Sequence, residues 1–209
     1  MKIFLVLVLY VFTVFQCMAL SQATIERMIL KGSTVNGAEF TAFSFNSSIN
    51  GCSVMLPAHV AWNVKTAKSL TFTNRAGQAL MVKTPYVSML DLDKDYAVVE
   101  LEYSDCVDLK FDAAAVALGE SALISGFRLG SQELELGLAT RSLDSTYVEM
   151  NQFHLFSTII SGVGLSGSPL IKNRDGDMTV SGMLIGADRH KCLNFDTDDE
   201  DKQCIASSI

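Results

Sequence analysis

The stretch GVGLSGSPL, residues 162–170, sets one serine among small residues between two apolar runs, FSTII before it and PLI after it. A packed core would favour larger side chains at these positions. Glycines on both sides of Ser166 allow backbone angles and close approaches that other residues avoid. The pattern therefore indicates either a loose surface turn or a loop that presents the Ser166 hydroxyl to something else.

A nucleophilic serine needs a base, and the sequence holds only three histidines. His59 follows an apolar strand over residues 54–56 and Pro57-Ala58, which places its imidazole at the rim of a sheet, on a rigid element, as a general base requires. His154 lies within the apolar run FHLFSTII and is typical of a strand residue. His190, in DRHKC, is typical of an exposed loop. His59 is therefore the favoured base.

A histidine base also needs a carboxylate that fixes its tautomer and stabilises the imidazolium. The stretch DLDKDYAVVELE offers Asp91, Asp93 and Asp95. Asp95 is favoured because it directly precedes the apolar strand YAVVEL. A calcium loop is the competing interpretation, with Glu102 at its twelfth position, but Tyr96 stands where the sharp turn of such a loop requires glycine.

The rest of the chain is patterned as strands. Short β-rich runs at residues 70–73, 79–84, 96–102, 122–127 and 133–140 are separated by Gly, Asn, Asp or Ser. Asp175-Gly176 between two apolar runs predicts a hairpin. No long amphipathic helix occurs, so the pattern predicts an antiparallel barrel or sandwich. Residues 113–117, in DAAAVALGE, are expected to form a helical turn or a linker between two β halves.

Together and in this order, Ala58-His59 after a strand, Asp95 before AVV, and Gly-x-Ser-Gly-x-Pro-Leu resemble the chymotrypsin-like (trypsin-fold) serine proteases. The resemblance covers roughly residues 30–190, and the Gly-x-Ser-Gly-Ser-Pro variant is similar to that of short viral and bacterial members. It implies two antiparallel six-stranded β-barrels with the active site in the cleft between them. The expected divisions are 24–110 for the first barrel, 111–191 for the second, and 192–209 for an acidic tail.

The resemblance also implies a role for each position. Ser166 would be the nucleophile, His59 the base and Asp95 the orienting carboxylate of a serine endopeptidase. The N–H groups of Gly164 and Ser166 would form the oxyanion hole. The substrate pocket would be lined by Ile160, Ile185 and Gly186 and would take an apolar or uncharged side chain.

Two positions depart from the family pattern. Zymogen-type members carry an aspartate just before the nucleophile, which binds the freed N-terminal amine, but Leu165 stands there and cannot bind an ammonium. No Ile-Val-Gly-Gly-like start lies near residues 24–40, so activation of that type is not expected. Val60 replaces the cysteine that often follows the family's histidine.

The first 23 residues have the order of a secretory signal: Lys2, an apolar run, then small residues, with cleavage expected after Ala19 or Ala23. An uncleaved signal anchor is the alternative. If the signal is cleaved, the secreted chain retains four cysteines: Cys52, Cys106, Cys192 and Cys204. They predict two disulfides, with Cys192–Cys204 the favoured pair. Asn46-Ser47-Ser48 is a glycosylation sequon if the source is eukaryotic or viral.

Charge and spacing also limit the partners. The full chain carries 16 basic and 23 acidic residues, and removal of Lys2 with the signal changes the net charge from −7 to −8, which argues against nucleic-acid binding. The cysteine spacings match no zinc pattern. The resemblance implies protein or peptide substrates. We also expect a monomer that needs no cofactor or metal and does not bind a membrane once the signal is removed.

Two other functions compete for the same residues. An α/β-hydrolase elbow requires Gly-x-Ser-x-Gly, but Ser168 occupies the last place and no helix-forming sequence follows. A non-catalytic relative could use the same barrels for binding or adhesion, because a fold does not fix a function. The presence of His59, Asp95 and Ser166 together favours the enzyme.

Overall fold

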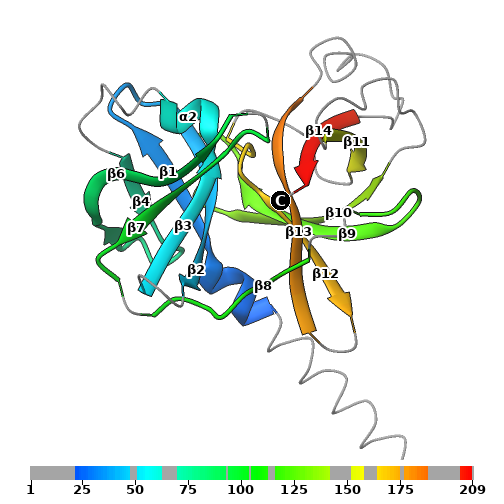
Figure 1. The fold of residues 1–209 in the computed structure, drawn as a ribbon, viewed down its shortest axis with the longest axis horizontal. Helices are drawn as coiled ribbons and strands as arrows, with labels where there is room; N and C mark the ends of the chain where they lie inside the picture. The colour runs from blue at the N-terminus through cyan, green and yellow to red at the C-terminus, as the bar shows by residue number, and fades with distance from the viewer. Residues whose placement is uncertain are drawn as a thin grey trace, which may run out of the picture.

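The computed structural model describes residues 22–47, 51–62, 70–92, 94–103, 105–112, 116–141, 152–157, 164–174, 177–187 and 203–208. In these segments the strands form two seven-stranded sheets, with one helix over residues 22–28 and a second, α2, at Ala58–Trp62. Figure 1 shows the two sheets side by side. The predicted all-β class is confirmed.

The first sheet belongs to the N-terminal half of the chain. Its strands are β1 (Ile29–Thr34), β2 (Glu39–Ser47), β3 (Gly51–Pro57), β4 (Leu70–Thr73), β5 (Ala79–Leu80), β6 (Val82–Asp91) and β7 (Tyr96–Leu101). They are antiparallel neighbours in the order β5-β4-β1-β2-β3-β7-β6. Only Met81 separates β5 from β6, so the two edges of the sheet are consecutive in the chain and the sheet curls into a barrel.

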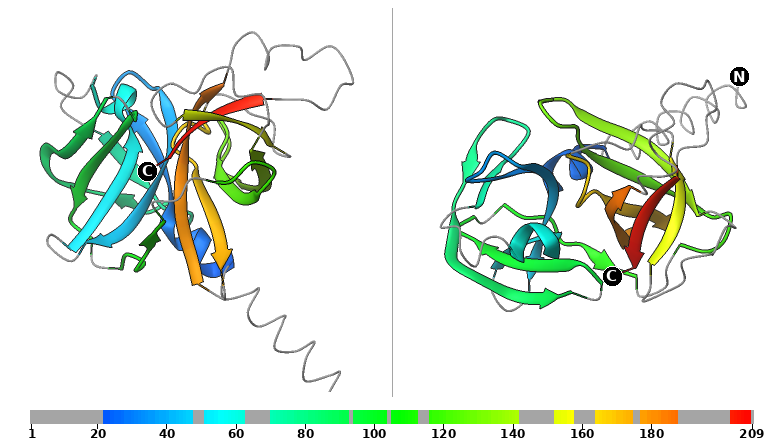
Figure 2. Two further views of the ribbon diagram at one scale, coloured as in Figure 1. Left: turned by 45° about the vertical axis from the view of Figure 1, so that its right-hand side comes forward. Right: turned by 90° about the horizontal axis from the view of Figure 1, so that it is seen from above.

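The second sheet closes on itself. Its strands are β8 (Lys110–Phe111), β9 (Ser121–Phe127), β10 (Leu134–Arg141), β11 (Gln152–Ser157), β12 (Pro169–Arg174), β13 (Asp177–Ala187) and β14 (Gln203–Ser208). Because β12 pairs with both β9 and β13, six of these strands form a closed antiparallel ring. The two-residue β8 is added in parallel beside β13. Seen from above, both sheets curl into rings (Figure 2).

The strands predicted from sequence are present, with one break and small shifts at their ends. The run at 79–84 is interrupted at Met81, and the hairpin predicted around Asp175-Gly176 is formed by β12 and β13. Strand β14 was not predicted. It pairs with β11 and β13, so residues 203–208 are part of the second barrel, beyond the boundary at residue 191 that the sequence suggests.

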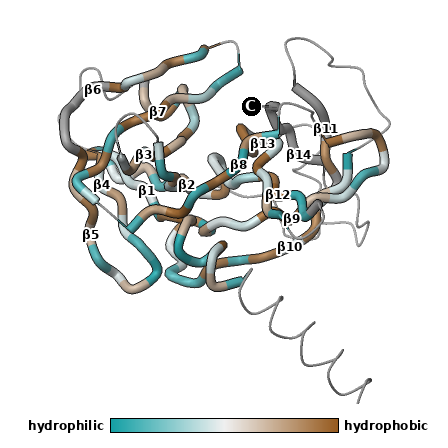
Figure 3. The backbone as a smooth tube through the Cα atoms, turned by 60° about the horizontal axis from the view of Figure 1, so that its bottom comes forward, coloured by the Kyte–Doolittle hydropathy of each residue, from teal (hydrophilic) through white to brown (hydrophobic). Residues whose placement is uncertain are grey.

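Strands at the junction of the barrels are buried on both faces. In β2, Phe40 and Ala42 pack in the interior of the first barrel, whereas Phe43 packs toward the second. In β7, Val99 points inward and Val98 points to the junction. Side chains of a strand alternate between its faces, so a strand between two apolar layers needs an apolar residue at nearly every position. Figure 3 shows apolar segments along the strands of both barrels.

The junction layer draws on both barrels and on the N-terminal helix. Ile25 and Met28, 3% and 0% exposed, come from the helix over residues 22–28. They pack with the outer faces of the two sheets in one cluster, whose other buried members are Ile29, Phe43, Met55, Val98, Phe127, Ile171, Val180 and Met183. Burial of this layer fixes the two barrels against each other, because each apolar side chain removed from water contributes about 2 kcal/mol.

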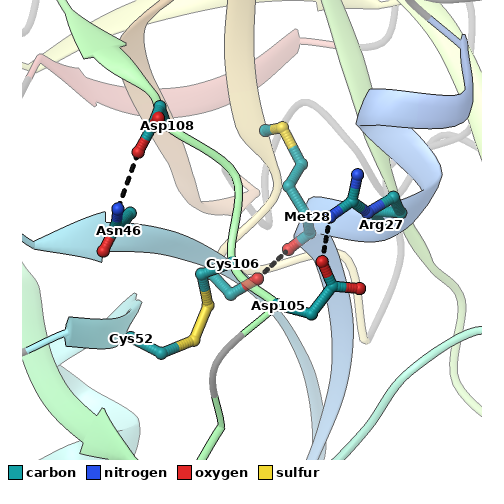
Figure 4. Close-up of a disulfide and its surroundings, with 8 residues drawn as sticks. Arg27, Met28, Asn46, Cys52, Asp105, Cys106 and Asp108 are labelled. Carbon is teal, nitrogen blue, oxygen red and sulfur yellow. Dashed lines mark hydrogen bonds and ion pairs between the residues drawn. A yellow bond between two sulfur atoms is a disulfide. The ribbon is translucent and has the colours of Figure 1, made fainter.

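The connection between the barrels is tied to the first one (Figure 4). A disulfide joins Cys106 in this connection to Cys52 on β3. Asn46 donates from its main-chain N to Val107 O and from Nδ2 to Asp108 Oδ1, each at 2.8 Å. Asp105 forms an ion pair with Arg27 of the N-terminal helix. The connection therefore leaves the first barrel from a fixed position.

Several sequence predictions fall outside the described residues. They include most of the signal segment, the acidic run, and Cys192 of the pair Cys192–Cys204. Cys52–Cys106 uses the other two of the four cysteines that follow the signal-like segment. Ser48 of the sequon is also outside. Within the described segments, no helix is long and apolar enough to cross a membrane.

Candidate active site

Asp95 and His59 are held together by the pairing of β3 with β7. The register sets Pro57 opposite Tyr96, so the residues that follow β3 meet the residue that precedes β7. Asp95 Oδ1 accepts a hydrogen bond from the His59 main-chain N at 2.8 Å, and Asp95 Oδ2 lies 2.7 Å from His59 Nδ1. The Asp95 carbonyl accepts from Ala58 N at 3.0 Å. One aspartate thus fixes both the backbone and the ring of the histidine.

The backbone of Asp95 is in the left-handed region, with φ of 54°. It is the one described residue other than glycine with positive φ, a conformation that costs on the order of 1 kcal/mol or more. The hydrogen bonds to Ala58 and His59 hold it there. Such strain is found preferentially where a side chain must be aimed, and here the aimed group is the carboxylate.

The two side chains differ in exposure. The His59 side chain is 52% exposed and that of Asp95 is 19% exposed. Because the carboxylate faces Nδ1, Nε2 is the ring nitrogen left to exchange a proton with another group. This is the arrangement of an oriented general base, with the carboxylate shielded and the imidazole accessible.

The loop that carries Ser166 is a turn built on two glycines. Gly164 has φ of +100° and Gly167 has φ of +98°, both unfavourable for residues with a Cβ. Ser168 N donates to Leu165 O at 3.0 Å and closes the turn around Ser166, which is half-buried. From Gly164 onward the stretch is therefore a closed turn with buried residues on both sides of Ser166, rather than a loose surface turn.

Both glycines also lie against other chain segments. A Cβ on Gly167 would lie 1.7 Å from Thr41 O on β2 and 3.0 Å from Pro57 Cδ at the end of β3. A Cβ on Gly164 would lie 2.5 Å from Leu129 N. Pro57 is two residues before His59 and Gly167 is one residue after Ser166. The packing of Gly167 therefore brings the Ser166 loop to the end of the strand that leads to His59.

Leu165 anchors this loop in the second barrel. It is fully buried and packs in the interior cluster with residues that include Ile124, Leu155 and Leu170. Burial of a leucine stabilises the folded state by about 2 kcal/mol. The residue before Ser166, which cannot bind an N-terminal ammonium, thus fixes the loop by apolar packing.

The predicted pocket residues are only partly placed. Ile185 is half-buried against the junction layer, and Gly186 follows it in β13, with no heavy atom within 4 Å of a Cβ built on it. The register between β13 and β14 shifts between Leu184 and Gly186, and such irregularities often lie near active sites. Ile160 lies outside the described residues.

The other candidate bases and carboxylates have different surroundings. His154 is within β11, in register with Ile205, as its sequence predicts, and His190 and Asp93 lie outside the described residues. Asp91 Oδ1 accepts from Lys94 N at 2.9 Å and so caps the turn before Asp95. Strand β7 separates Asp95 from Glu102, so a calcium loop does not form. No group of three or more metal-ligating side chains occurs in the described part of the chain.

Sequence reasoning missed Thr41, a fully buried residue in β2. Its main-chain N donates to Ser166 O at 2.9 Å, and its Oγ1 donates to Gly164 O at 2.8 Å. Residues 39–47 read as an apolar strand, EFTAFSFNS, and nothing in that pattern indicates a contact with residues more than 120 positions away. The only available signal was a polar residue inside an apolar run.

No family model matches the sequence, and no curated protein is significantly similar to it. Solved structures are similar to it in fold. A serine-to-alanine mutant of Rv3671c from M. tuberculosis, in an inactive form, has a TM-score of 0.63 at 19% identity over 90% of this chain and 83% of that one. The active form of the Rv3671c protease has a TM-score of 0.62 at 20% identity, covering 89% and 78%.

A serine endoprotease of Yersinia pestis has a TM-score of 0.64 at 12% identity, and the match covers 89% of this chain and 60% of that one. These likenesses show that the chain has the fold of the chymotrypsin-like serine proteases. At these identities they establish the fold and not the chemistry of the site.

Proposed function

We propose that this protein is a secreted serine endopeptidase that hydrolyses peptide bonds through an acyl-enzyme. Ser166 is the nucleophile, His59 the general base and then acid, and Asp95 the orienting carboxylate. The observation that supports this most is the double contact of Asp95 with His59, through the main-chain N at 2.8 Å and Nδ1 at 2.7 Å. This pair stands beside the strand end on which the Ser166 loop packs.

The roles follow from the chemistry of acyl transfer. Ser166 Oγ attacks the carbonyl carbon of the scissile bond while its proton passes to His59 Nε2. The proton then passes to the leaving amine, which departs as the acyl-enzyme forms. Water, deprotonated by the same nitrogen, hydrolyses the ester and regenerates Ser166. Asp95 keeps the proton of the neutral imidazole on Nδ1 and stabilises the imidazolium that forms in each half-reaction.

The N–H groups of Gly164 and Ser166 form the oxyanion hole in this proposal. Position 164 requires glycine for two reasons. Its φ is +100°, and a Cβ built there would lie 2.5 Å from Leu129 N. A donor lost from such a hole typically lowers the rate by 10²–10³, about 3–4 kcal/mol. The conformation of Gly164 is therefore a catalytic requirement as well as a structural one.

The substrates are proteins or peptides with an apolar or uncharged side chain before the scissile bond. The supporting residues are Ile185, which is half-buried against the junction layer, and Gly186, whose missing side chain leaves space near the end of β13. Ile160 completes the proposed pocket. No charged residue in this set would select lysine or arginine.

Export from the cytoplasm is part of the proposal. The signal-like first 23 residues and the Cys52–Cys106 disulfide support it, since disulfides persist in oxidising compartments. Ile25 and Met28 are buried, and both follow the two proposed cleavage sites. Cleavage after Ala19 or Ala23 therefore leaves the residues that the junction layer requires.

A mixed-peptide library tests the function. The purified protein and its Ser166→Ala variant are incubated with the library, and the products are identified by mass spectrometry. We expect cleavage by the unmodified protein, with apolar or uncharged residues before the cut, and none by the variant. If the two proteins leave the library equally intact while both are folded, the non-catalytic binding module is the better proposal.

A further inference from the structure

We infer that Thr41 is a positioning residue for catalysis, whose side-chain hydroxyl sets the conformation of Gly164 and with it the direction of the oxyanion-hole N–H. The inference rests on the proposed serine endopeptidase function. Thr41 comes from the first barrel, whereas the loop it holds comes from the second. Through this hydroxyl, the geometry of the Ser166 loop depends on how the two barrels pack against each other.

The Thr41 hydroxyl both accepts and donates a hydrogen bond. It accepts a hydrogen bond from Phe127 N at 2.9 Å, and its oxygen lies 2.8 Å from Gly164 O and 3.5 Å from Phe127 O. A hydroxyl has one proton to donate, and the shorter distance directs it to Gly164 O. The hydroxyl thus joins the end of β9 to the start of the Ser166 loop.

The main-chain atoms of Thr41 contact the residues that follow Leu165, namely Ser166 and Gly167. Its N–H donates to Ser166 O at 2.9 Å, and its carbonyl lies where a side chain at Gly167 would have to be. These contacts use main-chain atoms and survive any substitution that keeps the strand. The contact with Gly164 is the one that depends on the threonine side chain.

Gly164 needs such a contact because glycine has unusual backbone freedom. Its φ of +100° directs the N–H that we assign to the oxyanion hole, and its carbonyl is on the far side of the same residue. With that carbonyl fixed by Thr41 Oγ1, rotation about the two backbone bonds of Gly164 is restricted. Without the hydroxyl, Gly164 gains access to conformations in which its N–H points elsewhere.

Burial makes the contact hard to replace. Thr41 is 0% exposed, and it lies on the face of β2 that also carries Phe43 toward the junction layer. A Cβ built on Gly126 would lie 2.8 Å from Thr41 Oγ1 and 2.0 Å from Ser168 Oγ, so neighbouring groups fill the space beside the hydroxyl. If the hydroxyl is removed, Gly164 O therefore loses its donor.

The test compares Thr41→Val, which removes the hydroxyl and keeps the branched shape, with Thr41→Ser, which keeps the hydroxyl. For each purified variant, kcat and KM are measured on a peptide selected from the library, and the rate of labelling by a fluorophosphonate probe is measured separately. We expect Thr41→Val to lower kcat roughly 10- to 100-fold, as a small misplacement of catalytic groups does, with KM changed less than about threefold. Thr41→Ser is expected to stay within about threefold of the unmodified protein in kcat.

Ser44→Ala is the matched control. Ser44 is another fully buried hydroxyl residue on β2, and its Oγ lies 3.3 Å from Met28 O, away from the Ser166 loop. Its loss is expected to lower the urea midpoint and leave kcat unchanged. An equal fall in kcat for Ser44→Ala and Thr41→Val would overturn the inference, because it would show a general effect of weakening the strand.

Thr41→Ala is the second variant, for the case in which valine places a methyl group against Gly164 O and prevents folding. It removes the hydroxyl with no added atom, and the same loss of kcat is expected. Full activity of either hydroxyl-free variant would overturn the inference and leave the proposed function standing. An unmodified protein that is folded but neither cleaves peptides nor reacts with the probe would overturn both.

Discussion

Glu39 on β2 accepts a hydrogen bond at 2.7 Å from the main-chain N of Gly130, in the turn between β9 and β10 of the other barrel. The Nζ of Lys31 lies 2.9 Å from the second carboxylate oxygen and also donates to Ser131 O at 3.1 Å. One ion pair of the first barrel thus holds a turn of the second. That turn follows Leu129, whose N faces Gly164, so the contact supports the Ser166 loop from behind.

This contact makes the stability of the protein depend on pH. The hydrogen bond from Gly130 and then the one from Lys31 lower the pKa of Glu39 below its ordinary value of 4.5. A lowered folded-state pKa contributes stability that is present above pH 4.5 and is lost as the pH falls through the folded-state pKa. We expect the free energy of unfolding of Glu39→Gln, measured with urea, to be lower than that of the unmodified protein at pH 7. The two values should converge as the pH falls below 4.5.

Glu133→Gln is the control for this experiment. Glu133 lies in the same turn, is exposed, and forms no ion pair with another described residue. Its substitution should change the free energy of unfolding little at any pH. A constant difference between Glu39→Gln and the unmodified protein from pH 7 to pH 3.5 would contradict the assignment.

Asp95→Asn tests the orienting carboxylate. Asparagine keeps the shape of the side chain, but it removes the negative charge and allows the wrong imidazole tautomer. We expect kcat to fall by about 10⁴, the loss seen when a triad carboxylate is replaced in this way, with little change in the urea midpoint. Asp91→Asn, which alters only the cap on Lys94 N, should retain nearly normal kcat. The reverse order of the two variants would show that the wrong aspartate has been assigned.

Gly167→Ala tests the close approach between the Ser166 loop and β2. The added Cβ would meet the main-chain oxygen of Thr41 at 1.7 Å, and alanine is also unfavourable at φ of +98°. We expect a loss of at least about 2 kcal/mol in the free energy of unfolding, measured with urea. Gly37→Ala separates the two causes, since Gly37 has φ of +78° and open space around it. Equal losses for the two variants would show that Gly167 is not packed as described.

Much of the fold could be predicted from the sequence because short β-rich runs are bounded by turn residues. The hairpin of β12 and β13 is one example, and the strand YAVVEL that follows the turn at Asp95 is another, since each is specified by residues near one another. Strand β14 was not predicted, because QCIASS contains a single large apolar residue, Ile205, and the strand is stabilised by its neighbours β11 and β13. Pairing with distant strands leaves no local signature.

In the site too, features specified by nearby residues could be predicted, whereas contacts between distant segments could not. His59 and Asp95 could be predicted to meet because each lies at the end of a recognisable strand, and Asp95 Oδ2 lies 2.7 Å from His59 Nδ1. The contribution of Thr41 could not be predicted, since a threonine in a strand has no local feature that indicates its partner across the junction. Gly164 and Gly167 were identifiable as special, but only the structure shows that Leu129 and Thr41 are the groups they approach.

Fluorophosphonate labelling tests most directly whether Ser166 is an activated nucleophile, because the probe needs no knowledge of the substrate. The purified protein and its Ser166→Ala variant are treated with the probe, and the modified residue is located by mass spectrometry. The triad proposed here predicts one modified residue, Ser166, with labelling abolished in Ser166→Ala and strongly slowed in Asp95→Asn. No labelling of the folded protein, or labelling that persists in Ser166→Ala, would contradict it.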